Sequence, residues 1–223
     1  MTKPYPVTGA EPNGQPGAWP SSVSTRLPTP VPRQLNLGCG QFARPGFLNV
    51  DIIPEAHADV FMDLNDPRSY AALPEGHFDI IVADHLLEHL NDVFGVMRAL
   101  SRLLRPGGVI EIRVPHFSRG MTHPQHTHCF DVSFPEYFKP TFKGYVGVEL
   151  ALVRMRLEYM VRFDLKAPFA SPRQIALLEK VNRVISGLAN AQPYACSRFW
   201  CQLVGGFEQI EFIFKKPAQP VRV

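Results

Sequence analysis

Histidines gather in one part of this sequence, close to a carboxylate. Six of the eight histidines lie between residues 85 and 128. The first group is His85, Glu88 and His89, which one helical turn would place on one face. The second group follows a strand-like run at 109–115 and consists of His116, His123, His126 and His128.

Three interpretations of these residues stay open. Imidazoles with a carboxylate suit a divalent metal of the zinc, iron or nickel type, which would be held here by His85, Glu88, His89, His126 and His128. A neutral imidazole can also accept a proton from a substrate hydroxyl or amine, and His116, at a strand end, is placed to do so. The third interpretation is that the histidines serve structure alone.

A second candidate site lies earlier in the chain. The apolar run Leu35-Asn36-Leu37 ends in Gly38-Cys39-Gly40, and two glycines this close allow a turn whose backbone approaches a ligand. With Ala43 in third place the run satisfies the loose dinucleotide fingerprint. Alone, this pattern does not choose between nicotinamide, flavin and S-adenosylmethionine (SAM).

Two acids follow at predicted strand ends. Asp51 ends the second run, where a carboxylate can accept both hydroxyls of a ribose. Asp63 ends a third run and could accept a hydrogen bond from an adenine amino group. For each acid the alternative is a solvated strand end or a helix cap.

Several elements must position these residues. Apolar and alternating runs predict strands at 35–37, 47–51, 58–64, 78–84, 109–115, 148–161 and 207–214. Apolar residues at helical spacing predict helices at 93–104 and 172–188, and a shorter one is expected at 194–203. The six residues 41–46 contain Pro45-Gly46, so no crossover helix fits between the first two strands.

Composition limits the class of protein. The 223 residues, 45% of them hydrophobic, suit one domain at 33–216, preceded by a proline-rich arm at 1–32 that is disordered or loosely docked. A net charge of +3 gives no electrostatic case for a nucleic-acid binder. We find no apolar run long enough to span a membrane and no signal peptide, and therefore expect a cytoplasmic protein.

Taken together, these motifs resemble the class I SAM-dependent methyltransferases. Residues 35–40 look like the glycine-rich first motif, Asp51-Ile52 like the ribose-binding acid and its neighbour, and Asp63-Leu64 like the adenine-contacting pair. Residues 78–84, ending in Asp84, look like the fourth-strand motif, and His85 follows directly. Residues 103–108 look like the turn before the fifth strand.

The resemblance implies an α/β fold: a Rossmann-like three-layer sandwich on a seven-stranded, mostly parallel sheet with an antiparallel last strand. It implies a SAM site formed by Gly38, Cys39, Gly40, Asp51, Ile52, Asp63, Leu64, Asp84 and His85. The short link before Phe47-Leu48-Asn49-Val50-Asp51 departs from the usual plan and resembles a compact bacterial subset. An oxidoreductase fits less well, because the acid follows the glycines too soon and no Tyr-x-x-x-Lys pair exists.

The histidines also resemble those of metal-assisted methyltransferases, which include enzymes acting on small-RNA 3′ ends and on ubiquinone precursors. Glu88-His89 match their acid-x-x-Glu-His motif, with His85 in place of the first acid. His126 or His128 resembles the later histidine pair. Glu-His is also common here in related enzymes that need no metal.

We therefore expect SAM-dependent methyl transfer, at oxygen, to a small-molecule or saccharide acceptor, with His116, His89 and Glu88 as catalytic candidates. The alternatives are an RNA 2′-O-methyltransferase and a SAM-binding partner protein without chemistry. Segments at 116–147 and 165–205 have no counterpart in a minimal domain, and we expect them to form the acceptor pocket or a homodimer face.

Overall fold

Seven strands form one sheet in the computed structural model, which describes residues 26–53, 56–120 and 123–218. The strand order is β3-β2-β1-β4-β5-β7-β6. β7 runs antiparallel to both of its neighbours, β5 and β6, and the other four pairs of neighbouring strands are parallel. This confirms the predicted Rossmann-like sheet and its antiparallel last strand. The strands are β1 (Gln34–Leu37), β2 (Leu48–Asp51), β3 (Val60–Phe61), β4 (Phe78–Asp84), β5 (Leu104–Pro115), β6 (Ala151–Glu158) and β7 (Gln209–Lys215).

Most boundaries lie close to the predicted ones, and three differ markedly. β6 keeps only Ala151–Glu158 of the predicted run at 148–161. β5 begins at Leu104 rather than Val109, because Leu104 pairs with Phe78 before a register shift that absorbs the glycine-containing turn. β3 keeps only Val60–Phe61 of the predicted run at 58–64, since it pairs with β2 over two residues at the edge of the sheet.

The link between β1 and β2 contains no helix, as predicted. Two buried asparagines hold it instead. Asn36 donates to Asn49 Oδ1 at 3.0 Å and to the Phe42 carbonyl at 3.2 Å. Asn49 accepts from Arg44 N at 2.8 Å and donates to the carbonyls of Arg44 and Phe47. Backbone groups that a helix would have paired are thus satisfied by side chains.

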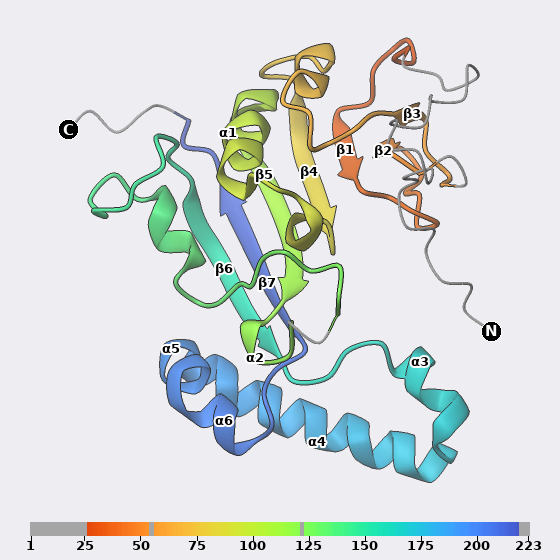
Figure 1. Ribbon diagram of the computed structural model, residues 1–223, viewed down its shortest axis with the longest axis vertical. Helices are drawn as coiled ribbons and strands as arrows, with labels where there is room; N and C mark the ends of the chain where they lie inside the picture. Colours follow the sequence, from red (N-terminus) through yellow and green to blue (C-terminus); the bar gives the residue numbers. More distant parts are fainter. Residues whose placement is uncertain (1–25, 54–55, 121–122, 219–223) are drawn as a thin grey trace, which may run out of the picture.

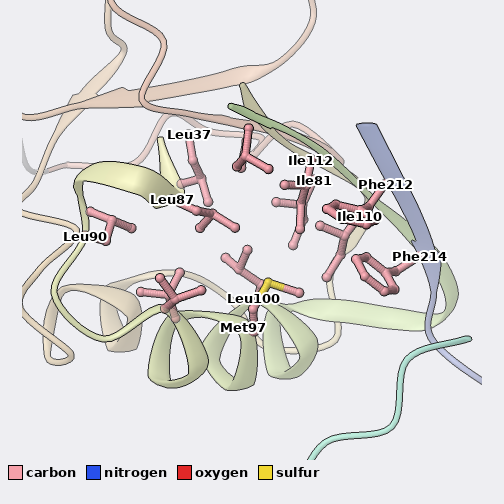
Figure 2. Packing of buried hydrophobic residues seen from close by; sticks show 14 of the residues in the cluster. Leu37, Ile81, Leu87, Leu90, Met97, Leu100, Ile110, Ile112, Phe212 and Phe214 are labelled. Atoms are coloured by element: carbon pink, nitrogen blue, oxygen red, sulfur yellow. The ribbon is translucent and has the colours of Figure 1, made fainter. Parts of the chain in front are cut away.

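Helix α1 (Val93–Leu103) begins at Asp92, whose carboxylate accepts from Gly95 N, and it covers the central strands. Figure 2 shows its Met97 and Leu100 packed toward Ile81, Ile110 and Ile112 of the sheet. All five side chains are fully buried. This packing fixes the direction of β4 and β5 and so positions the residues at their carboxyl ends.

The remaining helices gather at the end of the sheet to which β4 and β5 point (Figure 1). They are α2 (Phe117–Gly120), α3 (Phe163–Lys166), α4 (Pro172–Ala191), α5 (Pro193–Ala195) and α6 (Cys201–Leu203), with a π-helical turn at Cys196–Trp200. Short 3₁₀ turns lie at Ser69–Ala72, Leu87–His89, Phe134–Phe138 and Ala167–Phe169. Ser171 and Gln174 form a capping box at the start of α4, which extends three residues beyond the predicted end.

The predicted arm at 1–32 falls outside the described residues as far as residue 25. In the rest of it, Leu27 and Val31 pack half-buried against the core. Among the helices that the structure describes, none is long and apolar enough to cross a membrane.

Candidate active site

The glycine-rich loop leaves β1 in a left-handed conformation, with φ of +64° at Gly38 and +49° at Gly40. A Cβ on Gly38 would lie 2.9 Å from Leu86 Cδ1, whereas one on Gly40 would meet nothing within 4 Å. The loop therefore has open space on the side of Gly40, as a cofactor cradle requires. Cys39 between them is buried, and burial raises the pKa of its thiol to about 12, so this cysteine packs rather than reacts.

Asp51, 5% exposed at the end of β2, binds this loop directly. Its Oδ2 accepts from Gly40 N at 2.7 Å, and its Oδ1 accepts from the backbone N–H groups of Ile52 and Ile53. A carboxylate has about four acceptor positions. Three are occupied, which leaves one for a ligand, and the predicted contact with ribose hydroxyls stays a prediction.

Asp63 and Leu64 lie next to this strand end, because Met62 N donates to Asp51 O at 3.0 Å. Leu64 is buried. Asp63 Oδ1 accepts from Asn65 N at 2.8 Å, an arrangement that closes a local turn. Its predicted contact with an adenine stays a prediction.

Asp84, at the end of β4, belongs to a charged network that the sequence analysis missed. Its Oδ2 accepts from Arg113 at 3.1 Å and from Arg44 at 3.4 Å. Arg113 also donates to Glu211, which is tied to Arg154 at 2.6 Å. The sequence feature that could have indicated this network is Arg113, because it is a charged residue among the apolar β5 residues Ile110, Ile112 and Val114, which are buried.

His85 follows in a left-handed conformation, φ +53°, unusual for a residue other than glycine. Its Nδ1 lies 3.1 Å from Glu88 Oε1 and its Nε2 lies 2.9 Å from Gln209 Oε1. Both partners are acceptors, since Gln209 Nε2 donates to Glu158. Burial pulls the pKa of His85 down, but hydrogen bonds and charge from Glu88 outweigh it and raise the pKa above its ordinary value. Gln209 was not recognised from sequence.

Glu88, His89 and His126 come together although 38 residues separate the first from the last. One ligand atom from each lies within 4.8 Å of the other two. Thr127 connects the two segments, donating its N–H to Glu88 O at 2.8 Å and its hydroxyl to the same atom at 3.1 Å. Among the described residues, the fully buried Glu88 Oε2 has no hydrogen-bond partner.

Carbonyl groups orient the two imidazoles of this group. His89 Nδ1 lies 3.2 Å from Gln125 O and His126 Nδ1 lies 2.6 Å from Gly120 O. A carbonyl only accepts, so each Nδ1 carries a proton, and in the neutral ring the lone pair is then on Nε2. The residues thus present two imidazole lone pairs and one carboxylate oxygen, a donor set that suits a divalent cation.

The other predicted ligands lie outside this group. His85 is occupied on both ring nitrogens, and His128 Nε2 bonds the Asn91 carbonyl at 3.3 Å. His123 stacks on His126. His123, His126 and His128 therefore have three different environments, which spacing alone could not distinguish.

His116, the predicted general base, is fully buried. Its Nδ1 lies 2.8 Å from the Ser118 hydroxyl and its Nε2 lies 2.9 Å from the Ser197 hydroxyl. Burial lowers its pKa to about 4, partly opposed by Asp131. The ring connects the end of β5 to the π-helical turn, and the base role stays a prediction.

A groove of about 890 Å³ lies between β6 and α4. Its walls include Arg154, Arg156, Glu158 and, from the helix, Arg183. Glu158 bonds Gln209 at 2.9 Å, and Gln209 bonds His85. The groove is therefore connected to the carboxyl end of β4 through two hydrogen bonds.

Known proteins resemble this chain in sequence and in fold. A ubiquinone biosynthesis O-methyltransferase of Xanthomonas oryzae pv. oryzae is 31% identical over 105 residues, covering 39% of this chain and 44% of the relative. The corresponding protein of Xanthomonas campestris pv. campestris is 29% identical over 107 residues, covering 40% and 45%. The chain thus matches less than half the length of these relatives.

Solved structures show the fold. A SAM-dependent methyltransferase from Archaeoglobus fulgidus has a TM-score of 0.51 at 18% identity, covering 82% of this chain and 86% of that one. Another from Mesorhizobium loti has a TM-score of 0.50 at 14% identity, covering 82% and 90%. The model of a methyltransferase domain family matches residues 23–154, more than half of the sequence. The chain therefore belongs to this methyltransferase domain family.

Proposed function

We propose that this enzyme methylates a hydroxyl group of a small molecule, assisted by a divalent metal held by Glu88, His89 and His126. The observation that carries the metal is the buried Glu88 Oε2, which finds no hydrogen-bond partner in the part of the chain that the structure describes and lies beside the two oriented imidazoles. A carboxylate oxygen and two imidazole nitrogens close together are favoured when a cation lies among them. The O-methyltransferase names of the curated relatives support an oxygen acceptor.

The SAM site in this proposal is the loop at Gly38 and Gly40 together with Asp51. SAM supplies a methyl group on a sulfonium, ready for in-line displacement. The chain positions the cofactor: Gly40 leaves open space, and Asp51 retains one acceptor position for a ribose hydroxyl. Asp63 and Leu64 border the same strand end, where we place the adenine.

The acceptor, in our proposal, enters through the groove between β6 and α4. Its volume lies within the range of small-molecule sites, and Arg156 and Arg183 would attract a polar or acidic acceptor. Saccharides meet this description as well. Positioning and exclusion of water can supply most of the acceleration of such a displacement.

Glu88 and His89 are the groups we assign to the reacting hydroxyl. When a metal is bound, it lowers the pKa of a coordinated hydroxyl. Without one, His89 Nε2 is the oriented lone pair that can accept the proton. His116, with both nitrogens engaged, is assigned a positioning role at the base of the site.

Elemental analysis of the purified protein tests the metal. We expect close to one zinc, iron or nickel ion per chain, lost in Glu88→Gln and in His126→Ala. His123→Ala is the matched control, because His123 neighbours His126 but lies outside the group. A metal-free wild-type protein with full activity would exclude the metal while leaving methyl transfer intact.

Methyl transfer itself is tested by SAM binding and by release of S-adenosylhomocysteine with a panel of phenols, catechols and saccharides. An RNA substrate belongs in the panel, and activity that salt does not weaken on free small molecules would exclude RNA as the acceptor. Tight SAM binding without turnover on any acceptor or cell extract would contradict the proposed reaction.

A further inference from the structure

The C-terminal helices expose most of the large apolar side chains on the described surface. Nine of thirteen such residues lie between Leu165 and Leu203. Four of them follow one line along α4 and are 36% to 61% exposed: Leu177, Val181, Val184 and Leu188. We call these four the outer stripe. An apolar line on a helix about 30 Å long is a typical feature of an interaction surface.

The opposite side of α4 is fixed to the protein and sets the direction of the outer stripe. Asn190 exchanges two hydrogen bonds with the backbone of Leu157, and Ser186 and Asn182 accept from the backbone of Tyr159 and Met160. These three polar side chains cover the open edge of β6 and its continuation. The outer stripe lies about half a turn away from them.

The stripe therefore faces away from the sheet. Figure 1 shows α4 as an outermost element of the molecule, below the ends of the strands. Among the described residues, no contact lowers the exposure of these four side chains below 36%.

The spacing between the residues of the outer stripe is the same from either end of the helix. Its members are separated by four, three and four residues. When a second copy of α4 lies antiparallel, Leu177 falls opposite the partner's Leu188, and Val181 falls opposite the partner's Val184. A two-fold axis passing between residues 182 and 183 then brings the stripe into register with itself, which is the requirement of an isologous interface.

The residues beside the stripe are compatible with this arrangement. About such an axis, each side of the helix next to the stripe lies against the same side of the partner helix. On the side that carries Leu178 and Ile185, Leu178 lies next to the partner's Ile185, which extends the apolar contact. On the other flank, Lys180 lies next to the partner's Gly187, where even a Cβ would meet nothing within 4 Å.

We propose that two copies of this chain form a homodimer through the outer stripe, with their α4 helices antiparallel about this axis. The proposal is independent of the acceptor and of the metal. It leaves the groove between β6 and α4 open, because the groove lies on the inner side of the same helix.

Sedimentation of the full chain gives the first test. We expect wild-type protein to be dimeric, and Val184→Glu to be monomeric with an unchanged circular dichroism spectrum. Leu165→Glu is the matched control, because Leu165 is 51% exposed on α3 and lies outside the stripe; it should remain dimeric. Wild-type protein that is monomeric up to its solubility limit overturns the proposal.

Disulfide trapping tests the register in a Cys129→Ser background, which removes the exposed native thiol. A mixture of Leu177→Cys and Leu188→Cys proteins should cross-link under mild oxidation. Leu177→Cys alone should not, because its two copies would lie about 16 Å apart along the helices. Equal cross-linking of the single variant and the mixture overturns the antiparallel arrangement.

Discussion

Asn36 donates its side-chain amide to Oδ1 of Asn49 at 3.0 Å, and the two side chains are 3% and 6% exposed. This buried pair connects β1 to β2 and fixes the short link that carries the glycine-rich loop. A crossover helix does this in most parallel sheets. The proposed cofactor site therefore depends on two amide groups rather than on helix packing.

Replacing Asn49 with alanine should destabilise the fold and weaken SAM binding together. The substitution leaves Arg44 N and the Phe47 carbonyl without their present partners, at a cost of about 2 kcal/mol in unfolding free energy. Thermal unfolding and calorimetric titration with SAM measure the two effects. Asn91→Ala, at an exposed position, is the control, and equal behaviour of both variants would show that the pair does not hold the loop.

Asp51→Asn should weaken SAM binding at least tenfold with a smaller change in stability. An amide keeps the size of the carboxylate but gives up the charge-assisted hydrogen bonds, worth about 1.5 to 3 kcal/mol for a charged partner. Titration calorimetry measures the affinity. Asp66→Asn should change nothing, because Asp66 forms an exposed pair with Arg68. An unaltered affinity in Asp51→Asn would place the ribose elsewhere.

His116 should make stability depend on pH. Its folded-state pKa of about 4 lies below the unfolded value near 6.5, so between these values the unfolded chain binds more protons. Its contribution is present above pH 6.5 and is lost as the pH falls toward 4, by about 3 kcal/mol. Urea unfolding at several pH values should show wild type losing more stability than His116→Gln. Parallel curves would mean that His116 is not held neutral.

Two substitutions of His85 separate the effect of its left-handed backbone on stability from the effect of its side-chain hydrogen bonds on activity. At φ +53° asparagine is tolerated but valine is strained, so His85→Val should lower the melting temperature by several degrees and His85→Asn by less. Both variants lose the link from Glu88 to Gln209, and both should lose methyl transfer activity to a similar extent. An active His85→Asn enzyme would show that the link is dispensable.

The sequence by itself determined the features that depend on neighbouring residues. The apolar run at 80–83, with Phe78 before it, specified β4 close to its observed bounds, since a central strand of a parallel sheet needs apolar residues over most of its length. The glycines at 38 and 40 specified a left-handed loop, because few other residues adopt it. Ser171 followed by Pro172 specified the start of α4 for an equally local reason.

Only the tertiary structure decided which histidines meet. Six of them share one stretch of sequence, yet His126 joins Glu88 and His89 because Thr127 binds the Glu88 carbonyl. His85 is held by Gln209, 124 residues further along the chain, and His116 is buried against Ser197. Such contacts depend on how strand ends and loops pack in space, and local periodicity carries no information about them.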